Sequence, residues 1–200
     1  MLSNYHLILA SNSPRRKELL SGLGLDFEVC VIPGIDESYP AGCPPAEIPG
    51  YLARKKAAAY LPSMKDNDLI ITADTVVILD NDILEKPGSR DEAIHMLQRL
   101  SGRSHEVVTG VAVTTRRRQT AFSVTSSVDF AALTGEEIRH YVDTFQPYDK
   151  AGAYGIQEWI GYIGVQGIRG SFHNVMGLPV QRLYRELKKM DGEVPDFLNI

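Results

Sequence analysis

LILASNSPRRKEL, residues 7–19, is the stretch that decides how this fold begins. Residues 7–10 are apolar and typical of a buried strand. Ser13 followed by Pro14 is typical of a helix N-cap with proline at the first helical position. We therefore predict a strand, a tight turn, and a helix that begins at Pro14.

Arg15 and Arg16 fall in the first turn of that predicted helix, where the helix dipole favours acidic side chains and repels cations. A bound anion would compensate for this repulsion. The backbone N–H groups of the turn, the hydroxyls of Ser11 and Ser13, and the two guanidinium groups would together suit the oxygens of a phosphate chain. The alternative is an ordinary capped helix with surface arginines.

Chain length and net charge favour some classes of protein and argue against others. The 200 residues suit a single α/β domain, 1–200, long enough to bury an active-site cleft. A formal net charge of −4 argues against nucleic-acid and membrane-surface partners and favours a small phosphorylated ligand. Cys30 and Cys43 lack CxxC spacing, and the sequence shows no signal-peptide pattern and no long apolar run. We therefore expect a cytoplasmic protein.

Apolar periodicity along the chain indicates strands and helices that do not alternate strictly. This pattern predicts a twisted mixed sheet flanked by helices, with a groove between two lobes. Predicted helices cover residues 50–60, 91–100, 136–145 and 178–190. Predicted strands cover 26–32 and a hairpin of 107–115 and 119–130, and 151–168 is typical of glycine-punctuated strand and loop.

Asp74 interrupts an apolar run that covers residues 68–79. Burying an unpaired carboxylate is unfavourable, so its surroundings must supply a cation, several hydrogen bonds, or a reason to hold a proton. Asp74 is therefore a candidate general base or metal ligand. The alternative is a structural aspartate that caps a loop between two strands.

Other charged residues could complete an anion site. Residues 54–56 are basic and end an apolar-faced predicted helix, and Lys86 directly precedes a proline. Asp36 and Glu37 lie in a loop rich in proline and glycine, a kind of loop that often carries function. Each of these charges taken alone is equally consistent with a solvated surface.

Short motifs follow one another along most of the chain: SNSPRR at 11–16, ADT at 73–75, LEKP at 84–87, LSGR through TGV at 100–111, DKAGAYGIQ at 149–157 and GLP at 177–179. In this order they resemble the Maf family of nucleotide pyrophosphatases, over residues 7–186. The resemblance implies hydrolysis of nucleoside triphosphates to the monophosphate and pyrophosphate, dependent on Mg²⁺ or Mn²⁺. It also implies an elongated α/β fold of the Maf and inosine-triphosphatase type, with a cleft between two lobes, and a cytoplasmic homodimer.

The resemblance also implies roles for particular residues. Asp74 matches the proton acceptor of the family, and Glu37 matches a loop acid near the metal, which Asp74 would also contact. Lys56, which fits the motif better than Lys55, and Lys86 match catalytic basic positions. The positions that match the substrate-binding side are Ser11, Ser13, Arg15, Arg16, Thr75 and Gln157.

The motif at 149–157 resembles the branch of the family that prefers dTTP and UTP, with Arg15, Thr75 and Gln157 at its specificity positions. A glutamine amide offers a donor and an acceptor to the O4 and N3 edge of thymine or uracil. Glu158 and Trp159 follow where the family usually has glycine, and we expect them to reshape the base pocket. Alternatives are a 7-methyl-GTP pyrophosphatase and a nucleotide-binding regulator of septum formation that needs no turnover; modified pyrimidine nucleotides are further candidate substrates in a house-cleaning role.

Overall fold

Three long antiparallel strands carry the fold, and shorter strands extend them on both sides. The computed structural model describes residue 2 and residues 4–190. Its strands form one seven-stranded mixed sheet in the order β2-β1-β3-β5-β6-β7, with β4 also paired to β3. β1 runs parallel to β2 and β3, and the other pairings are antiparallel. The strands are β1 (His6–Leu9), β2 (Glu28–Val29), β3 (Asp68–Leu79), β4 (Asp82–Leu84), β5 (Ser104–Thr114), β6 (Gln119–Phe130) and β7 (Val165–Arg169).

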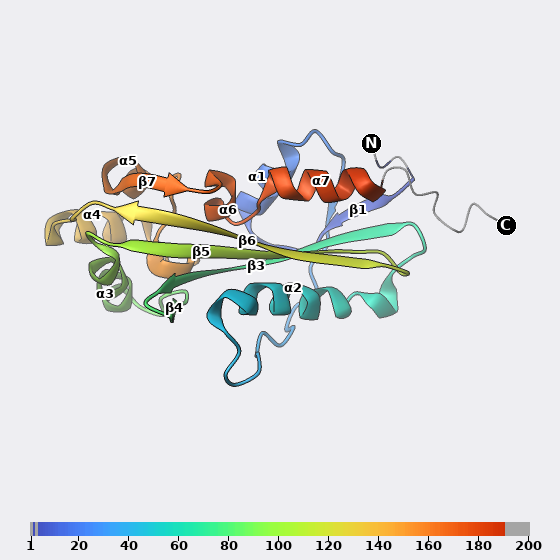
Figure 1. The fold of residues 1–200 in the computed structure, drawn as a ribbon, viewed down its shortest axis with the longest axis horizontal. Helices are drawn as coiled ribbons and strands as arrows, with labels where there is room; N and C mark the ends of the chain where they lie inside the picture. The colour runs from blue at the N-terminus through green and yellow to red at the C-terminus, as the bar shows by residue number, and fades with distance from the viewer. Residues whose placement is uncertain (1, 3, 191–200) are drawn as a thin grey trace.

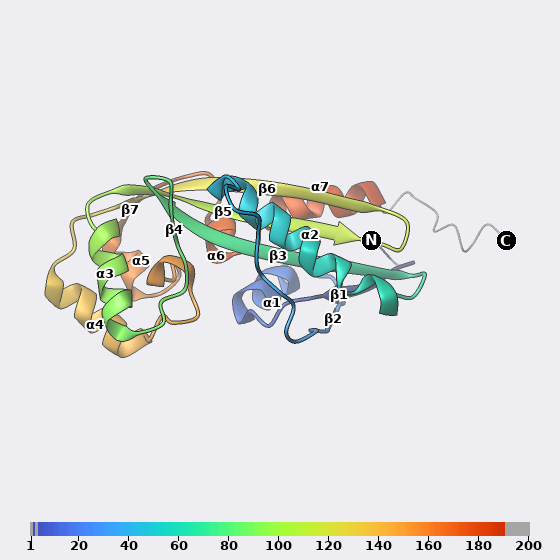
Figure 2. The same ribbon diagram turned by 90° about the horizontal axis from the view of Figure 1, so that it is seen from below.

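Helices cover both faces of this elongated sheet. α2 lies along one face, and α6 and α7 lie on the other (Figure 1). α3, α4 and α5 gather at one end of the sheet, while α1 lies further along it with β1 and β2 (Figure 2). This arrangement confirms the predicted mixed sheet flanked by helices. The helices are α1 (Pro14–Ser21), α2 (Ile48–Ala58), α3 (Arg90–Leu100), α4 (Gly135–Phe145), α5 (Trp159–Gly164), α6 (Phe172–Met176) and α7 (Val180–Met190), with short 3₁₀ helices at Pro45–Glu47, Leu61–Ser63 and Ala151–Ala153.

The first strand, turn and helix follow the prediction. β1 ends at Leu9, and α1 begins at Pro14 with Ser13 as its N-cap. The Ser13 hydroxyl accepts a hydrogen bond from the backbone N–H of Arg16 at 3.4 Å. The turn therefore leaves the end of the strand and places the start of α1 beside β3.

β3 is continuous through Asp74, so the interruption in its apolar pattern is not an interruption of the strand. Asp74 pairs with Gly110 of β5, and Thr75 pairs with Thr109. On the other side of β3, pairing with β1 stops at Ile71, and pairing with β4 begins at Val77. Residues 72–76 therefore have a sheet neighbour on one side only, and this free edge of β3 is where the site lies.

Small residues let α2 approach the sheet closely. Ala53 and Ala57 of α2 pack against Ala112 of β5. A Cβ atom added at Gly110 would lie 2.2 Å from backbone atoms of Pro49 and of the residue that follows it, far inside van der Waals contact. Because no side chain separates helix from strand at this point, the α2 side chains reach the β3 residues beside Gly110.

The structure corrects several predicted elements. The strand expected over 26–32 is reduced to the two residues of β2, and the loop after it is held by Tyr60, whose hydroxyl accepts from Ile32 N and donates to Cys30 O, both at 3.0 Å. The strand and loop expected over 151–168 contain the 3₁₀ helix, α5 and the start of β7. Within residues 2 and 4–190, no helix is long and apolar enough to cross a membrane.

Candidate active site

The predicted site residues converge on one cleft at the free edge of β3. The cleft has two adjoining hollows, and both are lined by the start of α1 and by side chains from α2 and from the loop before it. Both hollows are also lined by residues of β3 and by Asp149. The end of α6 lines only the first hollow, and the turn at 10–12 lines only the second. The predicted residues that line one or both hollows are Ser11, Ser13, Arg15, Arg16, Glu37, Lys56, Asp74, Thr75, Lys86 and Gln157.

Lys56 bridges two carboxylates at the centre of the cleft. Its Nζ lies 2.7 Å from Oδ1 of Asp74 and 3.2 Å from Oε2 of Glu37. The Lys56 and Asp74 side chains are 15% and 14% exposed, whereas Glu37 is 58% exposed. The cation that a poorly solvated Asp74 requires is thus supplied by α2.

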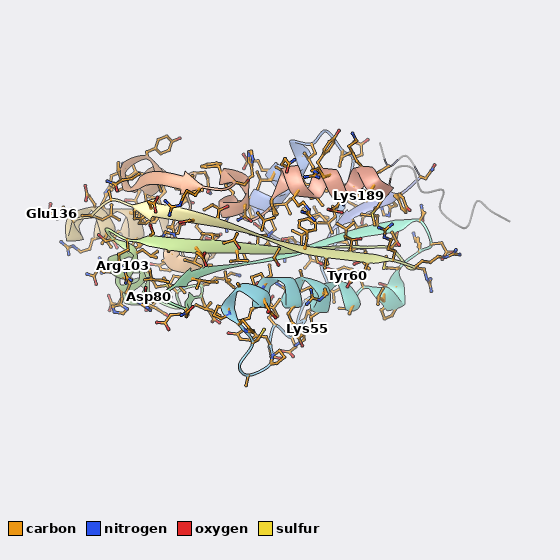
Figure 3. All side chains as sticks on the ribbon, viewed as in Figure 1. Lys55, Tyr60, Asp80, Arg103, Glu136 and Lys189 are labelled. Carbon is orange, nitrogen blue, oxygen red and sulfur yellow. The ribbon has the colours of Figure 1, made fainter. Side chains whose placement is uncertain are left out.

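Lys55, labelled in Figure 3, contacts different residues from the adjacent Lys56. Its Nζ lies 2.7 Å from Oδ2 of Asp36 and donates to the carbonyl oxygen of Ser38, also at 2.7 Å. The hydrogen bonds from Lys55 and Ser38 hold the pKa of Asp36 well below its usual range. Lys55 therefore ties the loop to α2 on both sides of Glu37, which helps to place Glu37 against Lys56.

Arg16 closes the free edge of β3 with most of its hydrogen-bond donors. Its Nη1 donates to Ala73 O at 2.9 Å and to Ser11 Oγ at 3.4 Å. Its Nε donates to Gly177 O at 2.8 Å, and its Nη2 donates to Thr75 Oγ1 at 3.1 Å. Burial lowers the pKa of Arg16, although the charge of the nearby Asp74 opposes this shift. A guanidinium has five N–H donors, so one Nη2 hydrogen is left for a ligand.

Arg15 spans the cleft to Asp149, a partner that sequence reasoning did not assign. Arg15 Nη1 lies 3.0 Å from Asp149 Oδ2, and the largely buried Lys150 lies 2.7 Å from Asp149 Oδ1. Partial burial works to raise the pKa of Asp149, but the hydrogen bonds and charges of Lys150 and Arg15 lower it overall. Asp149 stood in a recognised motif, but only the folded chain shows that it faces the start of α1.

Gln157 lines the first hollow, whose lining also includes the apolar residues Val77, Val107 and Met176. Its Oε1 atom is buried, and within the described part of the chain it has no hydrogen-bond partner. A buried acceptor without a partner is unfavourable and marks a place where a ligand donor would be accommodated. Gln157 is therefore well placed to accept a hydrogen bond from a ligand.

Glu158 and Trp159, which we expect to reshape the base pocket, are not among the residues that line the hollow with Gln157. The Glu158 carboxylate contacts the Tyr141 hydroxyl and lies 3.1 Å from Lys150 Nζ. The Trp159 ring packs edge-on against His140 at a centroid distance of 4.9 Å. Glu158 therefore touches the cleft through Lys150, which lines the first hollow.

Asp74 and Glu37 form a donor set that suits Mg²⁺ or Mn²⁺ bound together with phosphate oxygens. Among residues 2 and 4–190, no group of three or more histidine, cysteine, aspartate or glutamate side chains could hold a metal ion by itself. Mg²⁺ is commonly bound by one or two carboxylates, with water and substrate phosphates completing its shell. The two carboxylates at Lys56 fit that pattern, with one oxygen of each directed to the ammonium group.

Comparison with known proteins identifies the family of this chain. A model of the Maf family, described as Maf-like protein, matches residues 6–190. The dTTP/UTP pyrophosphatases of Bacteroides thetaiotaomicron and Parabacteroides distasonis are each 59% identical to this chain; the matches cover 94% of it and 98% and 97% of those proteins. The dTTP/UTP pyrophosphatase of Porphyromonas gingivalis is 58% identical, over 94% of this chain and 95% of its own.

Solved structures show the same fold at low identity. The Ham1 protein of Staphylococcus aureus has a TM-score of 0.55 and 17% identity, covering 92% of this chain and 98% of that one. A HAM1 protein from Coxiella burnetii has a TM-score of 0.51 and 16% identity, covering 92% and 99%. These likenesses confirm the predicted fold class, and the family match over most of the chain confirms the resemblance drawn from its motifs. The chain belongs to the Maf-like protein family.

Proposed function

We propose that this protein hydrolyses dTTP and UTP to the nucleoside monophosphate and pyrophosphate. The observation that carries the proposal is the group formed by Lys56, Asp74 and Glu37, which faces the basic turn after β1 across a single cleft. The name dTTP/UTP pyrophosphatase, borne by relatives 58–59% identical to this chain, supports the same reaction and the same bases.

The phosphate chain fits the side of the cleft nearest α1. The first backbone N–H groups of a helix carry partial positive charge and bind phosphate oxygens well. Arg15 and Lys86 both line the cleft and add full charges to it, and Lys86 is exposed. Arg15 would exchange its contact with Asp149 for a phosphate oxygen, because a phosphate offers it a stronger charged partner.

Asp74 acts on the water that attacks the α-phosphorus. In this displacement a bond forms between the water oxygen and the α-phosphorus, and the bond from that phosphorus to the bridging oxygen breaks. Asp74 takes the proton of the water or orients the water for attack, and its Oδ1 lies 2.7 Å from Lys56 Nζ. Lys56 and Lys86 stabilise the charge that moves to the leaving pyrophosphate.

Asp74 and Glu37 are the residues that would hold Mg²⁺ or Mn²⁺. When bound, such an ion supplies neutralisation of the phosphate charge. Lys56, which bridges the same two carboxylates, would then move its ammonium group toward the phosphate oxygens.

The base fits the first hollow, where the Gln157 amide would meet it. The unpaired Oε1 of Gln157 suits the imide N–H that thymine and uracil share. This placement favours pyrimidines over 7-methyl-GTP and extends to modified pyrimidine nucleotides, in a nucleotide-pool house-cleaning role. We further propose that the protein is a cytoplasmic homodimer. Analytical ultracentrifugation would measure its mass and so test the dimer.

The test is product analysis with Mg²⁺ or Mn²⁺ and a panel of dTTP, UTP, dUTP, CTP, GTP, ATP and 7-methyl-GTP. Release of TMP or UMP with pyrophosphate, and its loss in Asp74→Asn, is the expected result. Tight binding without turnover on any nucleotide would instead support a regulator that only binds nucleotides. Preferential cleavage of 7-methyl-GTP would overturn the assignment of the base.

A further inference from the structure

Thr109 lies directly behind the site and has no part in the chemistry proposed above. It stands on β5 opposite Thr75 of β3, and its side chain is fully buried. The two hydroxyl oxygens lie 2.9 Å apart. The Thr75 oxygen also accepts from Arg16 Nη2, and Thr75 lines the first hollow of the cleft.

Thr75, Thr109 and the Asn174 carbonyl form a row of hydrogen-bonded groups, and the groups at its ends fix the direction of each bond. Thr109 Oγ1 donates to the backbone carbonyl of Asn174 at 3.1 Å, and a carbonyl oxygen can only accept. A hydroxyl has one hydrogen, so Thr109 has none left for Thr75. Thr75 must therefore donate its own hydrogen to Thr109, while it accepts from Arg16.

The Asn174 carbonyl, at which this row of hydrogen bonds ends, is held in place by its surroundings. The Asn174 side chain is fully buried, and its Nδ2 donates to Val107 O at 3.1 Å and to Ser126 Oγ at 3.0 Å. Its backbone N–H is bound by Ser171 Oγ at 3.2 Å. These contacts attach α6 to β5 and β6, so the carbonyl that orients Thr109 does not turn away.

The Thr75 hydroxyl consequently presents only a lone pair to the cleft. It lines the same hollow as Arg15 and Arg16 of the basic turn and as Gln157. A lone pair there attracts a ligand N–H and repels a ligand ring nitrogen that is itself an acceptor. Uracil and thymine carry N–H at N3, from which Thr75 Oγ1 and Gln157 Oε1 would both accept, whereas cytosine carries an acceptor at the same place.

We propose that Thr109 is a positioning residue for base selection, which holds Thr75 as an acceptor and so favours uracil and thymine nucleotides over cytosine nucleotides. The inference rests on the proposed function, because it assumes that a pyrimidine base occupies this hollow. Without the Thr109 oxygen, the Thr75 hydrogen is free to turn into the cleft and donate to cytosine N3.

The test is the ratio of kcat/KM for UTP to that for CTP in Thr109→Val, Thr109→Ser and Thr114→Val. Valine keeps the shape and strand preference of threonine, and the Asn174 carbonyl retains its bond from Gly177 N at 3.0 Å. Thr114 is a buried threonine in the same strand, away from the cleft, and serves as the matched control. We expect the ratio to fall about tenfold in Thr109→Val and to stay unchanged in the other two.

Equal loss of activity on UTP and CTP in Thr109→Val, with the ratio preserved, would overturn the inference, since a merely structural role gives that result. If Thr109→Val does not fold, Thr109→Ala must show the same fall in ratio. Titration of UTP and CTP binding keeps the two proposals separate. Wild-type protein that binds UTP more tightly than CTP but cleaves neither would remove the proposed reaction and leave the inference standing, whereas equal affinities would remove the inference.

Discussion

Lys56 Nζ lies 2.7 Å from Asp74 Oδ1, across the interface where α2 meets β3. The two side chains are almost equally shielded from water, with 15% and 14% of their surfaces exposed. A pair this enclosed is sensitive to the loss of either member, because the remaining charge has little solvent to replace its partner. The pair therefore gives the sharpest tests of the proposed chemistry.

Replacing Asp74 by asparagine should lower kcat for dTTP and UTP by roughly a thousandfold, the scale of lost general-base catalysis. The fold should survive, because asparagine has the same shape and Lys56 keeps its contact with Glu37. Rate measurements, with circular dichroism to verify folding, decide the matter. Activity within tenfold of wild type would rule out Asp74 as the proton acceptor.

Lys56 and Lys55 are adjacent, yet they should respond differently to change. Lys56→Gln should reduce kcat by roughly a hundredfold, because it removes charge stabilisation at the phosphates. Lys55→Gln releases the Asp36 turn and should mainly raise KM, because Glu37 is then less firmly placed. Steady-state kinetics on both variants would expose a wrong assignment if their effects were equal or reversed.

Gly110→Ala tests whether the spacing of α2 from the sheet places Lys56. The added Cβ would lie 2.2 Å from α2 backbone atoms, so the helix must move or the strand must bend. We expect a destabilisation of roughly 3 kcal/mol or more and loss of turnover. Gly22→Ala, whose Cβ would lie 3.4 Å from the nearest atom, is the matched control and should change the free energy of unfolding by less than about 1 kcal/mol. Denaturant unfolding measures both.

His105 should make the protein less stable in acid. Its imidazole is buried against Phe130 and Tyr154, and burial lowers its pKa from 6.5 to about 4, although Asp129 opposes the shift. Between these values the unfolded chain binds more protons than the folded one, so the free energy of unfolding falls as the pH falls.

The expected loss between pH 7 and pH 4 is about 3 kcal/mol from this one group. Thermal unfolding across that pH range should show a shallower pH dependence in His105→Gln than in wild type, even though the variant starts from a lower Tm. Identical slopes would mean that other groups control acid stability.

Chelation should stop turnover without unfolding the protein. The carboxylates of Asp74 and Glu37 are paired with Lys56, so we expect the fold to persist without the ion. We expect EDTA to abolish pyrophosphate release and Mg²⁺ or Mn²⁺ to restore it, with an unchanged Tm. Full activity after exhaustive chelation would contradict metal dependence.

Those parts of the fold that depend on residues close together in the chain could be predicted from the sequence. Ser13 and Pro14 marked the start of α1 correctly, and the hairpin of β5 and β6 appeared where alternation placed it. Asp74 looked like a break in a strand, because the Lys56 that accommodates it comes from a distant segment. α5 was missed because its glycines are poor helix formers; Gly161 is needed there because a Cβ would lie 1.8 Å from Ile156 O.

The residues of the candidate site likewise fall into two groups, those that the sequence predicted and those that only the fold revealed. Residues carried by motifs, such as Lys56 and Gln157, were found from the sequence and lie in the cleft. Asp149 as the partner of Arg15 and Thr109 behind Thr75 depend on which segments meet across the sheet, and no spacing along the chain reveals that. Arg16 was expected to face phosphate, and its engagement with Ala73 O and Gly177 O appears only when the free edge of β3 is known.

That free edge has a consequence for solubility as well as for chemistry. An unpaired strand segment is a template to which a second chain can add, and proteins usually shield such segments with charge or cover. In this protein the cover is Arg16, whose guanidinium occupies the Ala73 carbonyl that a foreign strand would otherwise bind. The edge of β3 that is open to a substrate is thus protected from pairing with a second chain by Arg16, a residue of the substrate site. Loss of Arg16 should therefore promote aggregation in addition to impairing turnover.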